Sequence, residues 1–260
     1  SAWAWHKSRA KNVAKIVDKV ASIFPFEYDV YKEAGANVEF VGHPLVDIVK
    51  PKMTEAEANT FAGKQDDRKL ILIMPGSRLM EIEKMLPTLL EAAKLIKKQL
   101  PEVDFVMPRA GSIPLQMLEE KIKASGISVK ITEGNNYDLF SVADLALATS
   151  GTVTLEAALC GLGSVIVYRT NPLTYFIAKL VVNIPHIGLP NIVAGKSVLP
   201  ELIQDDFTPE KVAKEAMSLL ERERNAKMKE DLAYVKERLG KPGAVGRVAE
   251  LVLKIAGEKK

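Results

Sequence analysis

This chain of 260 residues contains little cysteine and histidine, and its net charge is small. Cys160 is its one cysteine, so no disulfide can form within the chain, and its apolar neighbours predict a buried, inert thiol. The three histidines, His6, His43 and His186, are too far apart to give a metal-ligand spacing. The net charge is only +3 and no basic segment is interleaved with aromatic residues, which argues against a nucleic-acid partner.

The sequence also lacks long apolar runs and the acidic motif of metal-dependent sugar transferases. No apolar run approaches the roughly twenty residues that span a bilayer, and no signal peptide is visible. The acidic pairs at 66–67 and 205–206 lie in polar stretches, and neither forms an Asp-x-Asp pattern. We therefore expect neither a metal nor another cofactor. With 47% hydrophobic and 27% charged residues, the composition is that of an ordinary globular protein.

Apolar runs alternate with helical patterns along most of the chain, which predicts an α/β fold. Short runs rich in Leu, Ile and Val are typical of buried parallel strands, and they span 69–74, 103–107, 128–132, 145–148 and 164–168. The first 43 residues predict a helix, a strand, a helix and a strand, at 7–18, 20–24, 27–35 and 37–41. Further helices are expected from the N-cap Thr208 to about Leu239 and at 244–256, and Pro87 predicts a kink or break near Met85.

Two strand–turn–helix junctions carry residues suited to a nucleotide diphosphate. Pro75-Gly76-Ser77-Arg78, with Glu81, follows the first predicted strand of this series, and Ser150-Gly151-Thr152, with Glu156, follows the fourth. Free backbone N–H groups and the positive end of the helix dipole converge at such a turn and favour an anion. Arg78 adds a guanidinium for phosphate, and Glu156 adds a carboxylate that can accept hydrogen bonds from sugar hydroxyls. The pair indicates a nucleotide whose diphosphate and ribose are held separately.

Either turn by itself has a plainer explanation. Gly and Ser occur in ordinary βα turns for conformational reasons, and Arg78 can be a solvated side chain of the first helical turn. A cation at that position opposes the helix dipole, however, which favours an anion nearby. Glu156 lies within the apolar run 155–159, so its carboxylate needs a partner.

Further segments extend this pattern to a known family. Leu189-Pro190-Asn191, Gly42-His43-Pro44, Phe24-Pro25-Phe26-Glu27 and Trp3-Ala4-Trp5, together with the two turns, resemble the lipid-A-disaccharide synthase family in order and spacing. The resemblance runs from Trp3 to about Gln204 and weakens in the C-terminal helices. It implies a GT-B type fold, with the tail of an N-terminal Rossmann-like domain at 1–50 and a complete C-terminal Rossmann-like domain, the UDP-sugar side, at 51–240. A last helix within 241–260 is expected to cross back to the first domain.

The resemblance implies an inverting glycosyltransferase. The family transfers 2,3-diacylglucosamine from UDP-2,3-diacylglucosamine to 2,3-diacylglucosamine 1-phosphate, releasing UDP and forming the β(1→6)-linked precursor of lipid A. Such a reaction needs a base for the attacking hydroxyl and stabilisation of the charge on the leaving diphosphate. In the family the base lies upstream of the position of Ser1, so no catalytic residue is assigned here and the chain by itself is expected to be inactive. The resemblance also implies a cytoplasmic protein, peripheral on the inner-membrane surface, and a homodimer.

Matching motifs then assign roles in substrate binding to Ser77, Arg78, Gly151, Thr152, Glu156 and Asn191. Arg78 would face the diphosphate, with backbone groups of the two turns adding phosphate contacts. Glu156 would bind the ribose hydroxyls, and Asn191 would line the cleft near the donor. An Asn in a loop also commonly bonds its own backbone.

Three features of the sequence each fit two interpretations. The apolar segment 172–184 fits contact with acyl chains or a membrane surface, and it fits a core helix packed on the sheet. Trp3 and Trp5 are either interface anchors or core aromatic residues. His43 resembles a hinge histidine of the family, and it also fits a simple turn before Pro44.

Two other functions fit parts of the pattern. Another GT-B enzyme that uses UDP-N-acetylglucosamine, such as a cell-wall glycosyltransferase or a 2-epimerase, would share the turn from Ser150 to Glu156. The segments Trp3-Ala4-Trp5 and Leu189-Pro190-Asn191 argue against that function. The second alternative is a non-catalytic fragment that binds a UDP-sugar.

Overall fold

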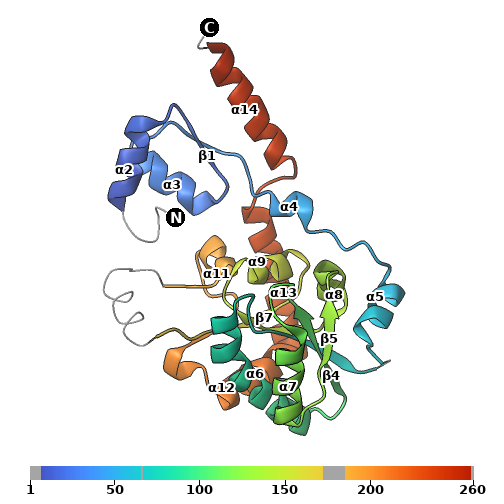
Figure 1. Cartoon of the computed structure of the whole chain (residues 1–260). Coiled ribbons are helices and arrows are strands. Elements are labelled where there is room, and N and C mark those ends of the chain that lie inside the picture. Colours follow the sequence, from blue (N-terminus) through green and yellow to red (C-terminus); the bar gives the residue numbers. More distant parts are fainter. Residues whose placement is uncertain (1–6, 66, 172–184, 259–260) are drawn as a thin grey trace.

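The structure, a computed structural model, describes residues 7–65, 67–171 and 185–258. A six-stranded parallel sheet with helices on both faces forms the larger part of the molecule (Figure 1). A smaller N-terminal part contains two short strands, and the last helix, α14 (Ala244–Glu258), lies beside it. The α/β class expected from the sequence is confirmed. Trp3, Trp5 and the apolar segment 172–184 lie outside the described residues.

The order of the strands places a switch point at the centre of the large sheet. Its strands are β3 (Lys69–Met74), β4 (Val103–Arg109), β5 (Lys130–Glu133), β6 (Leu145–Thr149), β7 (Ser164–Tyr168) and β8 (Glu201–Ile203). They stand in the order β5-β4-β3-β6-β7-β8, and every neighbouring pair is parallel. The chain therefore builds outward from β3 to β5, returns to place β6 against β3, and builds outward on the other side. Ligands of open parallel sheets bind beyond the carboxyl ends of the strands at such a point.

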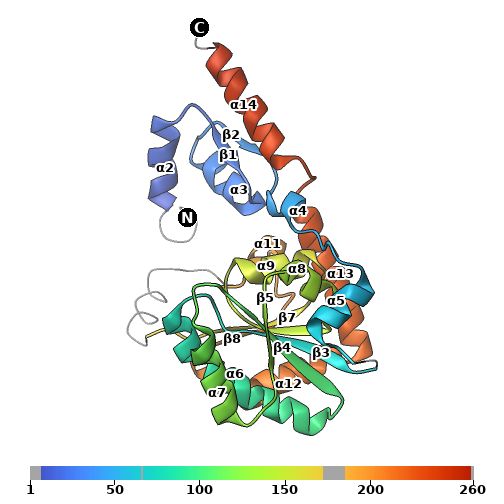
Figure 2. The ribbon, with the colours of Figure 1, turned by 45° about the vertical axis from the view of Figure 1, so that its right-hand side comes forward.

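Side chains alternate between the two faces of the strands and so fill two core layers. In β3, Ile71 and Ile73 pack toward α6 (Leu79–Gln99), whereas Leu70, Leu72 and Met74 pack toward α5 (Glu55–Ala62) and α8 (Asn136–Val142). Figure 2 shows the sheet between these layers, with α7 (Leu115–Ser125) and α12 (Pro209–Leu220) on the same side as α6. A sheet covered on both faces explains why the predicted strands are almost continuously apolar.

The remaining described elements complete the chain. The N-terminal part contains α2 (Lys7–Ile16), β1 (Val20–Ser22), α3 (Pro25–Glu33) and β2 (Val38–Phe40), and β1 pairs with β2 in parallel. The connector includes α4 (Leu45–Ile48). Beyond β6 come α9 (Thr152–Leu159), α11 (Leu189–Ala194), the 3₁₀ turn η1 (Gln204–Asp206) and α13 (Arg222–Arg238). Thr208 is the N-cap of α12, as predicted, and its side chain accepts a hydrogen bond from the backbone N–H of Lys211.

Two prolines behave differently from the prediction. Helix α6 does not break near Met85 but continues through Pro87 to Gln99. The carbonyl that loses its hydrogen-bond donor belongs to Glu83, and both residues are exposed, so water can replace the missing bond. Strand β4 also continues past its expected end at 107, through Pro108 to Arg109. This end of β4 extends beyond its pairing with β3, which stops at Val106, and pairs with β5 alone.

One strand was not predicted. Strand β8 has only three residues, too few for an alternation pattern, and the sequence marks this segment only through its motif at 200–204. It pairs with β7 along Ile166 to Tyr168 and so extends the sheet at that edge.

The N-terminal part is tied to the C-terminal helices where two segments cross: the connector that follows β2, and the link between α13 and α14. In the connector, the backbone N–H of His43 donates to the carbonyl of Leu239 over 2.9 Å. Arg247 of α14 donates from Nε to the carbonyl of Val41 over 2.8 Å. The Asp47 carboxylate accepts from the backbone N–H groups of Gly243 and Ala244 at the start of α14. These contacts hold α14 against the N-terminal part, while the domain limits at 50 and 240 stay a prediction.

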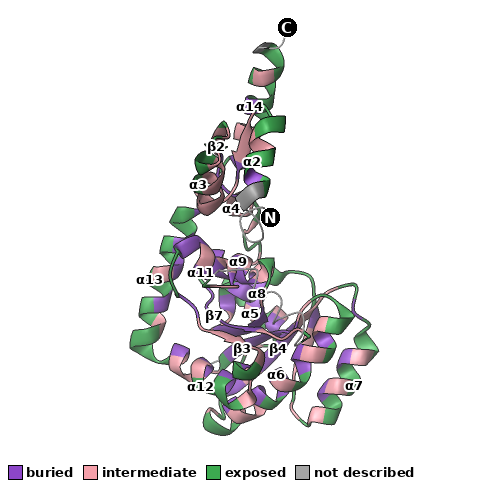
Figure 3. Ribbon diagram, turned by 90° about the vertical axis from the view of Figure 1, so that its left-hand side faces the viewer, coloured by how far each residue is buried: buried purple, intermediate pink, exposed green. Residues whose placement is uncertain are grey.

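Buried residues concentrate in the sheet and its covering helices (Figure 3). Cys160, at the end of α9, is half-buried, and burial raises the pKa of its thiol to about 11. Cys160 lines a surface pocket at the amino edge of the sheet, where Lys69 and Asp144 lie at the starts of β3 and β6. None of the described helices is both long and apolar enough to cross a membrane.

Candidate functional site

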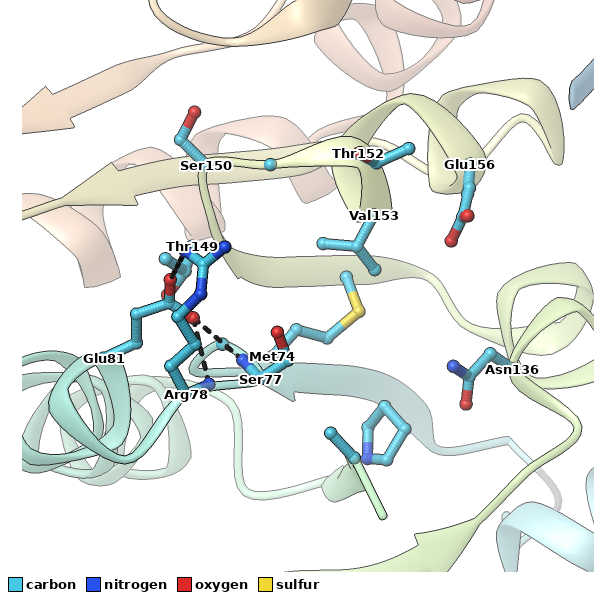
Figure 4. A pocket seen from close by; sticks show the side chains of 14 residues that line it. Met74, Ser77, Arg78, Glu81, Asn136, Thr149, Ser150, Thr152, Val153 and Glu156 are labelled. Atoms are coloured by element: carbon cyan, nitrogen blue, oxygen red, sulfur yellow. Dashed lines mark hydrogen bonds and ion pairs between the residues drawn. The ribbon is translucent and has the colours of Figure 1, made fainter. Parts of the chain in front are cut away.

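A pocket of about 420 Å³ lies at the switch point, where β3 and β6 end side by side. The two predicted turns form much of its wall, with Gly76, Ser77 and Arg78 from one and Ser150, Gly151 and Thr152 from the other. Figure 4 shows the side chains that line it, including Glu156 of α9. Five of the six residues predicted from the motifs therefore share one pocket: Ser77, Arg78, Gly151, Thr152 and Glu156.

The first turn presents a cation at the start of α6. Gly76 has a φ of +116°, a backbone conformation that favours glycine, and it lets the chain turn directly after β3. The Arg78 side chain is 81% exposed, and its Nη1 lies 2.9 Å from Oε1 of Glu81. Arginine has five N–H donors, so this single contact leaves most of the guanidinium for an anion. The turn is thus equipped for a phosphate.

The second turn presents backbone donors at the start of α9. The backbone N–H of Ser150 donates to the carbonyl of Val167, and its Oγ donates to the carbonyl of Ile187 over 3.0 Å, which fixes the turn from both sides. Thr154 Oγ1 donates to the carbonyl of Gly151 over 2.8 Å. The backbone N–H of Thr154 donates to the carbonyl of Gly151 over 3.2 Å, whereas those of Thr152 and Val153, which line the pocket, have no hydrogen-bond partner among the described residues. An anion in the pocket would meet them together with Arg78.

Glu156 supplies a carboxylate at the other end of the pocket. Burial raises the pKa of this carboxyl above its ordinary value, and no described residue forms a hydrogen bond with it. A half-buried carboxylate of this kind is costly until a donor meets it. Sugar hydroxyls are donors that an ionised carboxylate accepts well.

A second pocket, of about 490 Å³, adjoins the first and shares Asn136 and Glu156 with it. Its wall includes Tyr137 and connector residues such as Ile48 and Lys50. The buried carboxylate of Asp138 holds the connector there by accepting from the backbone N–H groups of residues 52 and 53, over 2.6 and 2.7 Å. The two adjoining pockets therefore extend from the two turns past Glu156 to the connector.

Several lining residues were missed in the sequence. They are Met74, Glu81, Pro108, Ala110, Asn136, Thr149 and Val153. Most stand at or directly after the carboxyl ends of β3 to β6, so listing the residues that follow each predicted strand would have found them. Glu81 follows the first turn closely in the sequence, but the sequence pattern predicts no role for it.

Asn191 does not line this pocket. It is fully buried in α11, where Nδ2 donates to the carbonyl of Leu199 and to Oε1 of Glu201, and Oδ1 accepts from the backbone N–H groups of Val198 and Leu199. All its hydrogen-bonding capacity is used inside the protein. The expectation that Asn191 faces the donor is therefore corrected to a structural role. Its effect on the site is indirect: Glu201 also accepts from Ile187, whose carbonyl holds Ser150.

His43 lies away from the pocket. Its ring is buried against Phe24, with ring centroids 4.6 Å apart, and Nδ1 accepts from the backbone N–H of Leu45 over 3.1 Å. Burial lowers the pKa of its imidazole, in keeping with this acceptor role. Among the described residues, no three His, Cys, Asp or Glu side chains converge to hold a metal ion.

Comparison with known proteins gives this pocket its context. The sequence model of a family described as lipid-A-disaccharide synthetase matches residues 1–254. The lipid-A-disaccharide synthases of Geobacter metallireducens and Geobacter sulfurreducens are each 42% identical to the chain, covering 99% of it and 67% of their own lengths. The chain thus spans about two thirds of the length of these curated relatives.

Solved structures show the same fold at low sequence identity. MnaA of Staphylococcus aureus, solved with UDP, aligns with a TM-score of 0.69 and 16% identity, over 94% of this chain and 62% of its own. The UDP-GlcNAc 2-epimerase of Neisseria meningitidis, bound to UDP-GlcNAc, aligns with a TM-score of 0.64 and 17% identity, over 93% and 62%. These likenesses establish a Rossmann-like fold of the GT-B type. Together with the family match, they lead to one conclusion: the chain belongs to the lipid-A-disaccharide synthase family of glycosyltransferases.

Proposed function

We propose that the pocket binds the UDP part of UDP-2,3-diacylglucosamine. The diphosphate lies between the two turns and near Arg78, and the ribose hydroxyls donate to Glu156. The observation that carries this proposal is the pairing of an exposed guanidinium with a half-buried carboxylate that has no hydrogen-bond partner among the described residues, in one pocket at the switch point of a parallel sheet. A nucleoside diphosphate offers both an anion and hydroxyl donors at a separation that such a pocket can serve.

The whole protein then transfers the diacylglucosamine to 2,3-diacylglucosamine 1-phosphate. The acceptor's 6-hydroxyl attacks the anomeric carbon as the bond to UDP breaks, and the pair of electrons of that bond leaves with the diphosphate. Arg78 and the N–H groups at the start of α9 stabilise the growing negative charge, which is the largest contribution that such a site can make. The base that takes the hydroxyl proton is not assigned to any described residue.

Both substrates of this reaction are amphiphiles, and apolar side chains stand close to Arg78. Leu79 and Met80, the next two residues, are 49% and 67% exposed although they are large and apolar. We place the acyl chains, or the membrane surface that presents them, on this side of the pocket. A cytoplasmic location, peripheral attachment to the inner membrane and a homodimer belong to the same proposal and rest on family membership.

The rival function is that of an enzyme for unacylated UDP-N-acetylglucosamine, the ligand named for the Neisseria epimerase. Competition between acylated and unacylated UDP-sugars for the pocket separates the two. Preference for the acylated donor supports the family reaction, and preference for the unacylated sugar contradicts it. A fragment that only binds would show the same preference without turnover.

Arg78→Ala tests the diphosphate assignment directly. Calorimetric titration should show UDP affinity about 10- to 100-fold lower, because a charge-assisted contact is lost, while uridine affinity hardly changes. Arg224→Ala is a matched control, since Arg224 pairs with Glu215 on the surface and does not line this pocket. Equal losses for UDP and uridine would place Arg78 away from the phosphates.

A further inference from the structure

The carboxylate of Glu81 makes three contacts with the phosphate turn. Its Oε2 accepts from the backbone N–H groups of Ser77 and Arg78, over 2.9 and 3.2 Å. Its Oε1 accepts from Nη1 of Arg78 over 2.9 Å. Figure 4 shows these bonds on the wall of the pocket. One side chain therefore fixes both the backbone of the turn and the guanidinium.

Helix capping alone does not explain this arrangement. At the start of α5, Thr54 and Glu57 form an ordinary capping box, in which the Thr54 hydroxyl accepts from the backbone N–H of Glu57 and the Glu57 carboxylate accepts from that of Thr54. At the start of α6 Glu81 likewise accepts from the backbone N–H of the N-cap, but the N-cap is Arg78, whose guanidinium has no acceptor atom for the return bond. A cation also opposes the helix dipole at this position. Arg78 is therefore an unfavourable N-cap for α6, but its charge suits a bound anion.

Gly76 is shaped to the same carboxylate. A Cβ at this glycine would lie 2.5 Å from Oε2 of Glu81 and 2.7 Å from its Cβ, too close for any side chain. Its φ of +116° separately favours glycine. The turn therefore leaves room for the Glu81 side chain to lie directly against the backbone.

Arg78 depends on this contact for its position. With 81% of its side chain exposed, its guanidinium has no ion pair or hydrogen bond to any other described residue. A long side chain without an anchor samples many rotamers, and ordering it on a ligand costs conformational entropy. Glu81 restricts that freedom before the ligand arrives, and it leaves the remaining N–H groups free.

We propose that Glu81 is a positioning residue for the donor diphosphate: it holds the Gly76-Ser77-Arg78 turn in its binding geometry and aims the Arg78 guanidinium. The inference rests on the proposed function of the pocket. It predicts that the benefit of Glu81 to the ligand passes through Arg78, even though its own negative charge repels a diphosphate.

A double-mutant cycle measured with UDP and uridine tests this. Glu81→Gln should weaken UDP binding about 3- to 10-fold, as expected for loss of an exposed ion pair that orders a ligand-binding side chain, and should leave uridine binding unchanged. In an Arg78→Ala background the same change should have no further effect on UDP, because the side-chain oxygen of glutamine can still accept from the backbone N–H groups of the turn. Glu57→Gln, which alters the capping box of α5, should leave both ligands unaffected.

The outcomes separate this inference from the function beneath it. Tighter UDP binding by Glu81→Gln would overturn the inference and make Glu81 a competitor of the phosphates. So would a loss that persists in the Arg78→Ala background or that extends to uridine, because Glu81 would then support the fold in general. If Glu81→Gln does not fold, Glu81→Asp, too short to reach all three donors, should likewise weaken UDP binding and leave uridine binding unchanged. A native chain that does not bind UDP at all would refute the proposed function itself.

Discussion

Glu156 is subject to opposite demands from folding and from binding. Its raised pKa means that the folded protein retains a proton that the unfolded chain has already released, over the interval between the ordinary and the raised value. Stability therefore falls as pH rises through this interval and stays lower above it. The ribose hydroxyls of the proposed ligand would offset this cost on binding.

Glu156→Gln should consequently stabilise the empty protein and weaken the complex. At neutral pH the melting temperature of the variant should exceed that of the native chain, and the difference should vanish below the ordinary pKa of a glutamate. UDP affinity should fall about tenfold, with little change for 2′,3′-dideoxy-UDP. Similar losses for both nucleotides would show that Glu156 does not contact the ribose.

Asn191→Asp tests the structural role assigned to the buried amide. The change replaces the Nδ2 donor by an oxygen that faces Oε1 of Glu201, at a position where the two atoms are now 2.7 Å apart. The free energy of unfolding should fall by about 2–5 kcal/mol, because buried oxygens of like charge would oppose each other. Chemical denaturation gives the value.

The double variant Asn191→Asp, Glu201→Gln restores a donor opposite the new carboxylate and should recover part of that loss. An Asn191→Asp chain with native stability and weakened UDP binding would return Asn191 to the ligand site.

The sequence predicted those site residues whose function depends on their chemical type. Arg78 and Glu156 are recognisable because a cation after one turn and a carboxylate after another suit a nucleotide. Asn136 and Pro108 line the same pocket through their position at the ends of strands, and nothing in their chemistry marks them. Asn191 has the chemistry of a ligand-binding residue, yet tertiary packing directs every one of its polar atoms inward.

Among the elements, the long apolar strands were predictable and the short or proline-containing segments were not. Strands β3 and β7 match the predicted ranges, because each face of the sheet is covered and the apolar pattern is uninterrupted. Strand β8 depends on pairing with β7, and β4 beyond Met107 depends on β5. Such pairings are between residues distant in sequence, so a local pattern does not reveal them.

Pro87→Ala should strengthen helix α6. The change restores an N–H donor to the carbonyl of Glu83 in an otherwise continuous helix of 21 residues. Removing a proline also frees the unfolded chain, which offsets part of the gain, so the free energy of unfolding should rise by about 1–3 kcal/mol. Pro101→Ala, just beyond the helix, should bring no such rise in denaturation experiments. Loss of stability in Pro87→Ala would mean that the ring itself packs in a required way.

At the scale of the whole molecule, the two crossing segments decide whether α14 and the N-terminal part move together. Asp47 belongs to the connector, and its carboxylate accepts from the backbone N–H groups of Gly243 and Ala244 at the start of α14. Arg247 of α14 also donates to the carbonyl of Val41, so a rotation about either of the two segments must strain the other. We expect α14 and the N-terminal part to move together.

Asp47→Ala should loosen this connection locally. Loss of a helix N-cap is worth about 0.5–2 kcal/mol, so the amides of α14 should exchange with solvent several-fold to thirtyfold faster. Amides of β3 should keep their native rates, since they belong to the core of the large sheet. Hydrogen exchange read by mass spectrometry distinguishes the two regions, and uniform acceleration would show that Asp47 supports global stability instead.

Cys160 gives the protein a natural site for thiol labelling. With a pKa of about 11, about one thiol in a thousand is ionised at pH 8, so reagents that need a thiolate should label the native chain slowly. The thiol lies at the end of α9, whose first turn borders the pocket at the opposite edge of the sheet. Labelling at this one site should therefore report on the end of α9, the helix that carries Glu156. A nucleotide that holds α9 in place would slow the labelling.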